Sequence, residues 1–183
     1  ILEQRTAKSD YVALDIDEAT LKKIPGYNPR QFICHDVSGG LPFESDSADL
    51  ILCMEVLEHL ERPSDFLAES KRVLKPGGRL ALTAWTTDGA VGDFFKLIAR
   101  YSPPPVEGAG TSLQWGDEDY CLERLGAAFD LSFTHHDVPW VGESPEDLWD
   151  EFSEAFGPIV VLLRSLDDER AAQVRVDREG QMR

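Results

Sequence analysis

Carboxylates stand near the ends of two apolar segments early in the chain. Asp15 lies at the end of the run YVALDID, and Asp36 at the end of the next run, RQFICHDV. A carboxylate at a strand end can accept hydrogen bonds from ribose hydroxyls or from an exocyclic amine such as adenine N6, and the backbone N–H of Val37 can serve a ring nitrogen. The two acids therefore predict a nucleoside site. The alternative is that each only caps the helix or turn that follows it.

A second ionisable group follows the apolar run Ala48 to Met54. Glu55, Glu58 and His59 stand at spacings i, i+3 and i+4, which on a helix places them on one face. Two carboxylates and an imidazole could hold Mg²⁺, or His59 could act as a general base. We favour the alternative without a metal, in which the acids form a first helical turn that complements the helix dipole.

Two further imidazoles are adjacent in the run DLSFTHHDVPWV. Its alternation predicts a late strand, and Pro139 suits a sheet edge. Neighbouring side chains of a strand point to opposite faces, so His135 and His136 do not bind one ion together. With His59 they are the candidates for a catalytic base, and the sequence does not decide among them.

Short turns separate these apolar segments from helix-forming ones. We expect strands over residues 11–17, 30–37, 48–54, 79–85 and 130–141, and helices over 18–24, 64–74, 92–101, 117–129 and 144–166. Candidate N-caps are Asp17, Ser64 and Ser144, and Pro76-Gly77-Gly78 predicts a turn. The continuous apolar run 48–54 is typical of a strand buried on both faces. The pattern predicts an α/β fold with a mostly parallel sheet and helices on both faces.

Composition narrows the functional class. With 183 residues, of which 42% are apolar, the chain is suited to a single domain. The net charge of −16 opposes nucleic-acid binding and favours a small-molecule substrate. There is no signal-peptide pattern and no run of about 18 apolar residues, and the three cysteines show no metal or disulfide spacing, so we expect a cytoplasmic protein without a membrane span.

Together these motifs resemble the class I S-adenosylmethionine-dependent methyltransferases, particularly the ubiquinone and menaquinone biosynthesis branch. The resemblance rests on YVALDIDEATL, HDVSGGLPFESDSADLILCMEVLEHL and RVLKPGGRLAL, in this order. It implies a Rossmann-like core over residues 1–86 and a variable substrate-side region with a small helical cap over 87–183, in one methyltransferase domain that is a monomer or a homodimer. It also implies S-adenosylmethionine as cofactor, with S-adenosylhomocysteine as product, and a small-molecule acceptor.

The resemblance carries roles over to individual residues. It assigns the ribose to Asp15, the adenine to Asp36 and Val37, and the methionine end to the residues that close the run 48–54. The implied cofactor-binding residues are Asp15, Ile16, Asp36, Val37, Cys53, Met54 and Glu55. Related quinone-pathway and RNA methyltransferases with a Glu-x-x-Glu-His metal site keep Mg²⁺ as a lesser possibility.

Two departures from the family pattern leave alternatives open. No GxGxG motif occurs, and ILE at residues 1–3 resembles the start of the family's first strand, followed abruptly by QRTAKSD. The last family strand is also not visible before Arg183. The alternatives are a non-catalytic or truncated domain of this fold that acts through protein contacts, and a nicotinamide-dependent oxidoreductase, whose cofactor also suits an acid at a strand end.

Overall fold

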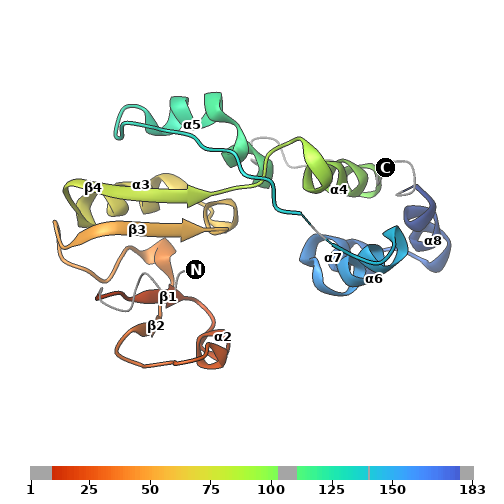
Figure 1. Cartoon of the computed structure of the whole chain (residues 1–183), viewed down its shortest axis with the longest axis horizontal. Helices are drawn as coiled ribbons and strands as arrows, with labels where there is room; N and C mark the ends of the chain where they lie inside the picture. Colours follow the sequence, from red (N-terminus) through yellow and green to blue (C-terminus); the bar gives the residue numbers. More distant parts are fainter. Residues whose placement is uncertain (1–9, 103–110, 140, 178–183) are drawn as a thin grey trace. The chain divides into compact units, whose positions relative to one another are not determined.

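The computed structural model describes residues 10–102, 111–139 and 141–177 (Figure 1). The chain divides into two compact units, Ile1–Leu82 and Thr83–Arg183. The segment at residues 1–3 that resembles a first strand lies outside the described residues. None of the described helices is long and apolar enough to cross a membrane.

The first unit begins with a parallel strand pair. Strand β1 (Ala13–Asp15) pairs with β2 (Phe32–Cys34), and Asp15 lies opposite Cys34. Helix α2 (Glu18–Lys23) connects them, and its N-cap Asp17 accepts a hydrogen bond from the backbone N–H of Ala19 at 2.9 Å. The predicted strand, helix and N-cap are confirmed here.

A second strand pair follows in the same unit. Strand β3 (Ala48–Met54) has the predicted bounds, and β4 (Leu74–Thr83) is its neighbour. Figure 1 shows the two arrows running in the same direction, with α3 (Pro63–Val73) as the connection between them. The backbone N–H of Ser47, just before β3, donates to the carbonyl of Val73 at the end of α3 at 2.9 Å. This is the predicted strand–helix–strand unit.

Three local expectations around this pair are wrong. Helix α3 begins at Pro63 with Arg62 as N-cap, because proline fits the first helical position, so Ser64 is not the cap. Strand β4 begins directly at Leu74, and Gly77 takes the left-handed φ of 79° inside the strand rather than in a separate turn. The expectation of two buried faces also fails for β3: Cys53 is buried, but Leu50, Leu52 and Met54 are each about half exposed.

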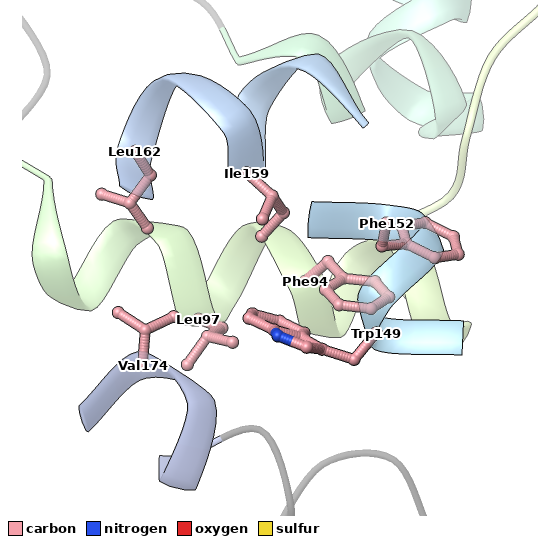
Figure 2. Packing of buried hydrophobic residues seen from close by; sticks show 7 residues of the cluster. All are labelled: Phe94, Leu97, Trp149, Phe152, Ile159, Leu162 and Val174. Carbon is pink, nitrogen blue, oxygen red and sulfur yellow. The ribbon is translucent and has the colours of Figure 1, made fainter. Parts of the chain in front are cut away.

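The second unit is helical in its described part. Its elements are α4 (Gly89–Tyr101), the 3₁₀ turn η3 (Ser112–Gly116), α5 (Glu118–Leu125), α6 (Pro145–Ala155), α7 (Gly157–Ser165) and α8 (Asp168–Asp177). Four of these helices, α4, α6, α7 and α8, share one apolar core (Figure 2). Its buried members are Phe94, Leu97, Trp149, Phe152, Ile159, Leu162 and Val174. The aromatic rings of Phe94 and Trp149 thus stabilise the packing between α4 and α6.

Two predictions for this unit need correction. The described residues 130–139, which include His135 and His136, form no strand, because no neighbouring strand is present in the described part of the second unit to complete a ladder. The single helix expected over 144–166 is two helices that meet at Phe156, since Gly157 and Pro158 favour a helix start over a continuous helix. The predicted N-cap Ser144 is confirmed, with its hydroxyl accepting from the N–H of Asp147 at 3.1 Å.

Candidate functional site

The register of β1 and β2 brings Asp15 and Asp36 to the same end of one strand pair. The backbone N–H of His35 donates to the carbonyl of Asp15 at 2.9 Å, so Asp36 follows directly after the last bond between the two segments. Ile16, next to Asp15, is 70% exposed. The carboxyl end of this strand pair therefore presents two acids and an open apolar side chain side by side.

Each of the two carboxylates uses one oxygen in a local turn. Oδ1 of Asp15 accepts from the N–H of Asp17 at 2.8 Å, and Oδ1 of Asp36 accepts from the N–H of Ser38 at 2.9 Å and from its hydroxyl at 2.6 Å. Both acids therefore form the turn contacts that the capping alternative predicts. Each can still accept hydrogen bonds from a ligand, because a carboxylate offers about four lone-pair positions and Oδ2 of both residues accepts no hydrogen bond from any described residue.

Asp36 is held as an anion next to a backbone donor. The hydroxyl and N–H of Ser38 lower the pKa of Asp36 below its ordinary value of 3.8. Val37 begins the 3₁₀ turn η1 (Val37–Gly39), and its backbone N–H, unlike those of Ser38 and Gly39, donates to no acceptor among the described residues. An acceptor and a donor on consecutive residues match the N6 and N1 edge of adenine, so the donor set fits a nucleoside.

The residues expected along the methionine end lie where β3 ends. Cys53 is buried, and burial, followed by the negative charge of Glu58, raises the pKa of its thiol to about 11. Met54 is half exposed, and Glu55 takes a φ of 52°, which is uncommon for a residue other than glycine. Such backbone strain is concentrated at functional sites. No described strand joins this sheet to the β1–β2 pair, which forms a separate two-stranded sheet.

The helix expected to unite Glu55, Glu58 and His59 is not formed. Glu55 precedes a short 3₁₀ turn, η2 (Leu57–His59), and its left-handed backbone interrupts the helical spacing on which the shared face depends. In the part of the chain that the structure describes, no group of three or more His, Cys, Asp or Glu side chains is arranged to hold a metal ion.

The remaining candidate bases lie in the second unit. His135 Nε2 is 2.8 Å from Oε1 of Glu118, and both side chains are about half exposed or more. An imidazole oriented by a carboxylate is a common arrangement for a general base. His136 is exposed. His59, the third candidate, lies in the first unit.

Sequence reasoning missed Glu69 and Arg72 on α3. Their opposite charges at spacing i, i+3 predict an ion pair on the helix, and the structure contains it, with Nη2 of Arg72 2.7 Å from Oε2 of Glu69. That spacing carries no information about the loop over residues 41–45, which both side chains also contact. The signal for this role is tertiary and is absent from the local sequence.

Comparison with known proteins relates the first unit to a described family. Residues 1–82, which are less than half of the chain, match the family model described as a methyltransferase domain. This part of the chain is therefore similar to methyltransferase domains. The matched residues include both candidate acids and nearly all of both strand pairs.

Two curated relatives align with part of this chain. A probable S-adenosylmethionine-dependent methyltransferase of Mycolicibacterium smegmatis is 39% identical over 67 residues, which are 37% of this chain and 26% of the relative. Demethylmenaquinone methyltransferase of Tropheryma whipplei is 38% identical over 68 residues, 37% of this chain and 28% of the relative. The matched stretch therefore spans little more than a quarter of either relative.

A solved structure supports the α/β fold beyond that stretch. The crystal structure of the cyclase SpnF aligns with 97% of this chain and 65% of its own chain, with a TM-score of 0.51 and 22% sequence identity. At that identity the likeness concerns the fold alone. The predicted α/β methyltransferase-like fold is confirmed.

Proposed function

We propose that this protein transfers a methyl group from S-adenosylmethionine to a small-molecule acceptor. The observation that carries the proposal is the pair of carboxylates at adjoining strand ends, Asp15 and Asp36, each with one oxygen directed to no described donor. The similarity of residues 1–82 to methyltransferase domains supports the same cofactor. The acceptor and the acceptor atom, whether oxygen, carbon or nitrogen, are not part of the proposal.

Each residue of the site has a binding or orienting role in this proposal. Asp15 accepts hydrogen bonds from the ribose hydroxyls, with Ile16 against the sugar, and Asp36 with the N–H of Val37 holds the adenine edge. Cys53, Met54 and Glu55 lie along the amino-acid end. When bound, S-adenosylmethionine supplies a methyl group on a sulfonium, which is a good leaving group. The chain therefore mainly has to align donor and acceptor.

A base is needed only for an acceptor that must lose a proton, such as a phenol. His59, His135 and His136 remain the candidates for this base, and the carboxylate of Glu118 can fix the tautomer and orientation of the His135 imidazole. The high pKa of Cys53 opposes a nucleophilic role for its thiol, since the neutral thiol is a poor nucleophile. Mg²⁺ has no part in the proposed reaction, and the cytoplasmic location and the monomeric or dimeric state stay predictions.

The fold alone does not establish methyl transfer, because a fold hosts many activities and SpnF, which shares this one, is described as a cyclase. A non-catalytic domain is therefore the competing function. The nicotinamide alternative rests only on Asp15, which suits the ribose of either cofactor. Titrations with S-adenosylhomocysteine and with NADH discriminate the three.

The test is calorimetric titration of S-adenosylhomocysteine into the wild type and into Asp15→Asn. Asparagine still accepts from the N–H of Asp17 but loses the charge, so we expect micromolar binding to weaken by about 1.5–3 kcal/mol, or roughly tenfold or more. Asp10→Asn, at an exposed acid outside the strand, is the matched control. No binding to the wild type would refute the proposal, and unchanged affinity in Asp15→Asn would remove Asp15 from the site.

A further inference from the structure

Two side chains of α3 hold the loop that leads from η1 to β3. Arg72 donates from Nη1 to the carbonyl of Phe43 at 2.9 Å and from Nη2 to the carbonyl of Leu41 at 3.2 Å, with a longer bond from Nη1 to the hydroxyl of Ser45 at 3.4 Å. Oε2 of Glu69 accepts from the N–H of Leu41 at 3.1 Å. We call these two residues the Glu69–Arg72 clasp.

The two members of the clasp also fix each other. Arg72 Nε lies 2.8 Å from Oε1 of Glu69, and Nη2 lies 2.7 Å from Oε2, so the pair is bidentate. Both side chains are about one-third exposed. The guanidinium of Arg72, together with the N–H of Leu41, lowers the pKa of Glu69 to about 2. The clasp is therefore fully charged at neutral pH, and its planar fork suits the loop carbonyls as a single ammonium would not.

The clasp acts on the chain a few residues after the proposed adenine contacts. Asp36 caps η1, Gly40 ends it, and Leu41 is the first residue held by the clasp. Gly40 takes a φ of 109°, and a Cβ at this position would lie 3.3 Å from Oε2 of Glu69. His35 Nε2 contacts the carbonyl of Gly40 at 2.8 Å. Contacts on both sides of η1 thus leave Asp36 and Val37 little freedom to move.

We infer that the Glu69–Arg72 clasp positions Asp36 and Val37 for recognition of the base of a bound nucleoside. The inference rests on the proposed function. Hydrogen bonds to a base edge are directional, so a shift of the turn by a fraction of an ångström weakens them without touching the ribose contact of Asp15. Glu69 and Arg72 are positioning residues, because neither lies at the strand end itself.

The readout is base discrimination, which a merely structural role would not change. S-Inosylhomocysteine carries an oxygen in place of the adenine amine, which turns a donor toward Asp36 into an acceptor. We expect the wild type to bind S-adenosylhomocysteine at least about tenfold more tightly than the inosine analogue. In Arg72→Gln the ratio of the two affinities, S-adenosylhomocysteine over S-inosylhomocysteine, should fall several-fold, toward one.

Lys71→Gln is the matched control, because it removes one positive charge from the neighbouring exposed position of α3. Its ratio should equal that of the wild type. In a double-mutant cycle, Asp36→Asn combined with Arg72→Gln should lower the ratio no further than Asp36→Asn alone, since both changes remove the same contact.

Two other variants keep the inference testable if Arg72→Gln does not fold. Arg72→Lys retains the charge but loses the fork, so its ratio should also fall. Glu69→Gln keeps the shape of the other clasp member but removes its charge, so its ratio should fall as well. A folded clasp variant with an unchanged ratio would overturn the inference and leave the function standing. A wild type that binds neither ligand would instead refute the proposed function.

Discussion

At the scale of single residues, burial divides the three thiols into two classes. Cys34 is exposed, whereas Cys53 and Cys121 are buried and burial raises the pKa of both. Because the thiolate is the reacting species, iodoacetamide at pH 8 should label Cys34 first and Cys53 last. Peptide mapping by mass spectrometry over time measures the order, and Cys34→Ser should remove the fast phase. Early labelling of Cys53 would contradict the buried position at the end of β3.

The individual site residues differ in how far local sequence can predict them. Asp15 and Asp36 could be placed at strand ends because each follows an apolar run, and the register of β1 and β2 brings them together. The left-handed backbone of Glu55 could not be predicted from local sequence, since a φ of 52° is unfavourable for glutamate and depends on the surrounding structure. The metal hypothesis for Glu58 and His59 depended on that backbone being helical.

At the scale of elements, one hydrogen bond joins the end of α8 to α4. The hydroxyl of Tyr101 donates to Oδ2 of Asp177 at 2.8 Å. Burial, and then this bond, raises the pKa of Tyr101 above its ordinary value of 10.0, while Gln173 and Tyr101 lower the pKa of Asp177. The folded state therefore retains the tyrosine proton more tightly than the unfolded state. The stabilisation is complete below pH 10 and is lost as the pH rises through the folded pKa.

Tyr101→Phe should accordingly lower the melting temperature at neutral pH by about 2–4 °C. The difference from wild type should begin to shrink above pH 10 and disappear as the pH rises through the raised pKa of the folded-state hydroxyl. It should also shrink in acid, beginning below pH 3.8 and ending as the pH falls through the lowered pKa of folded Asp177. Tyr120→Phe is the control, because the Tyr120 ring contacts Trp115 and Arg124 but its hydroxyl bonds to no described residue. Equal changes in melting temperature for the two variants at every pH would contradict a stabilising hydrogen bond between Tyr101 and Asp177.

The helices and strands could be predicted where the local sequence pattern is continuous. Prediction failed where contacts with distant segments decide the secondary structure. The apolar run 48–54 predicted the bounds of β3, because a short, nearly continuous apolar run between turn-forming residues is typical of a strand. Residues 130–139 alternate like a strand, but a strand requires a neighbour, which the sequence pattern does not report. Gly157 and Pro158 are a local signal for the break between α6 and α7. The prediction of one continuous helix followed the apolar periodicity on both sides of these residues instead.

At the scale of the whole molecule, the acidic residues are unevenly distributed along the chain. Residues 83–183 carry 20 of the 34 acidic residues but only 8 of the 18 basic ones, so most of the net charge of −16 belongs to the second unit. Like charges in a compact state repel one another and lower its stability. The ion pairs among the described residues of the second unit, such as Lys96 with Asp93, lie at exposed positions, where such pairs contribute little.

Screening should therefore stabilise this protein. We expect the melting temperature to rise by a few degrees as NaCl increases from about 20 to 300 mM, where the Debye length falls below about 6 Å, and then to level off. NaCl is preferred to sulfate, because sulfate also strengthens apolar burial by exclusion from the surface. Calorimetric scans at constant pH measure the effect. A melting temperature that falls with NaCl would mean that attractive surface pairs outweigh the repulsion among the acids of the second unit.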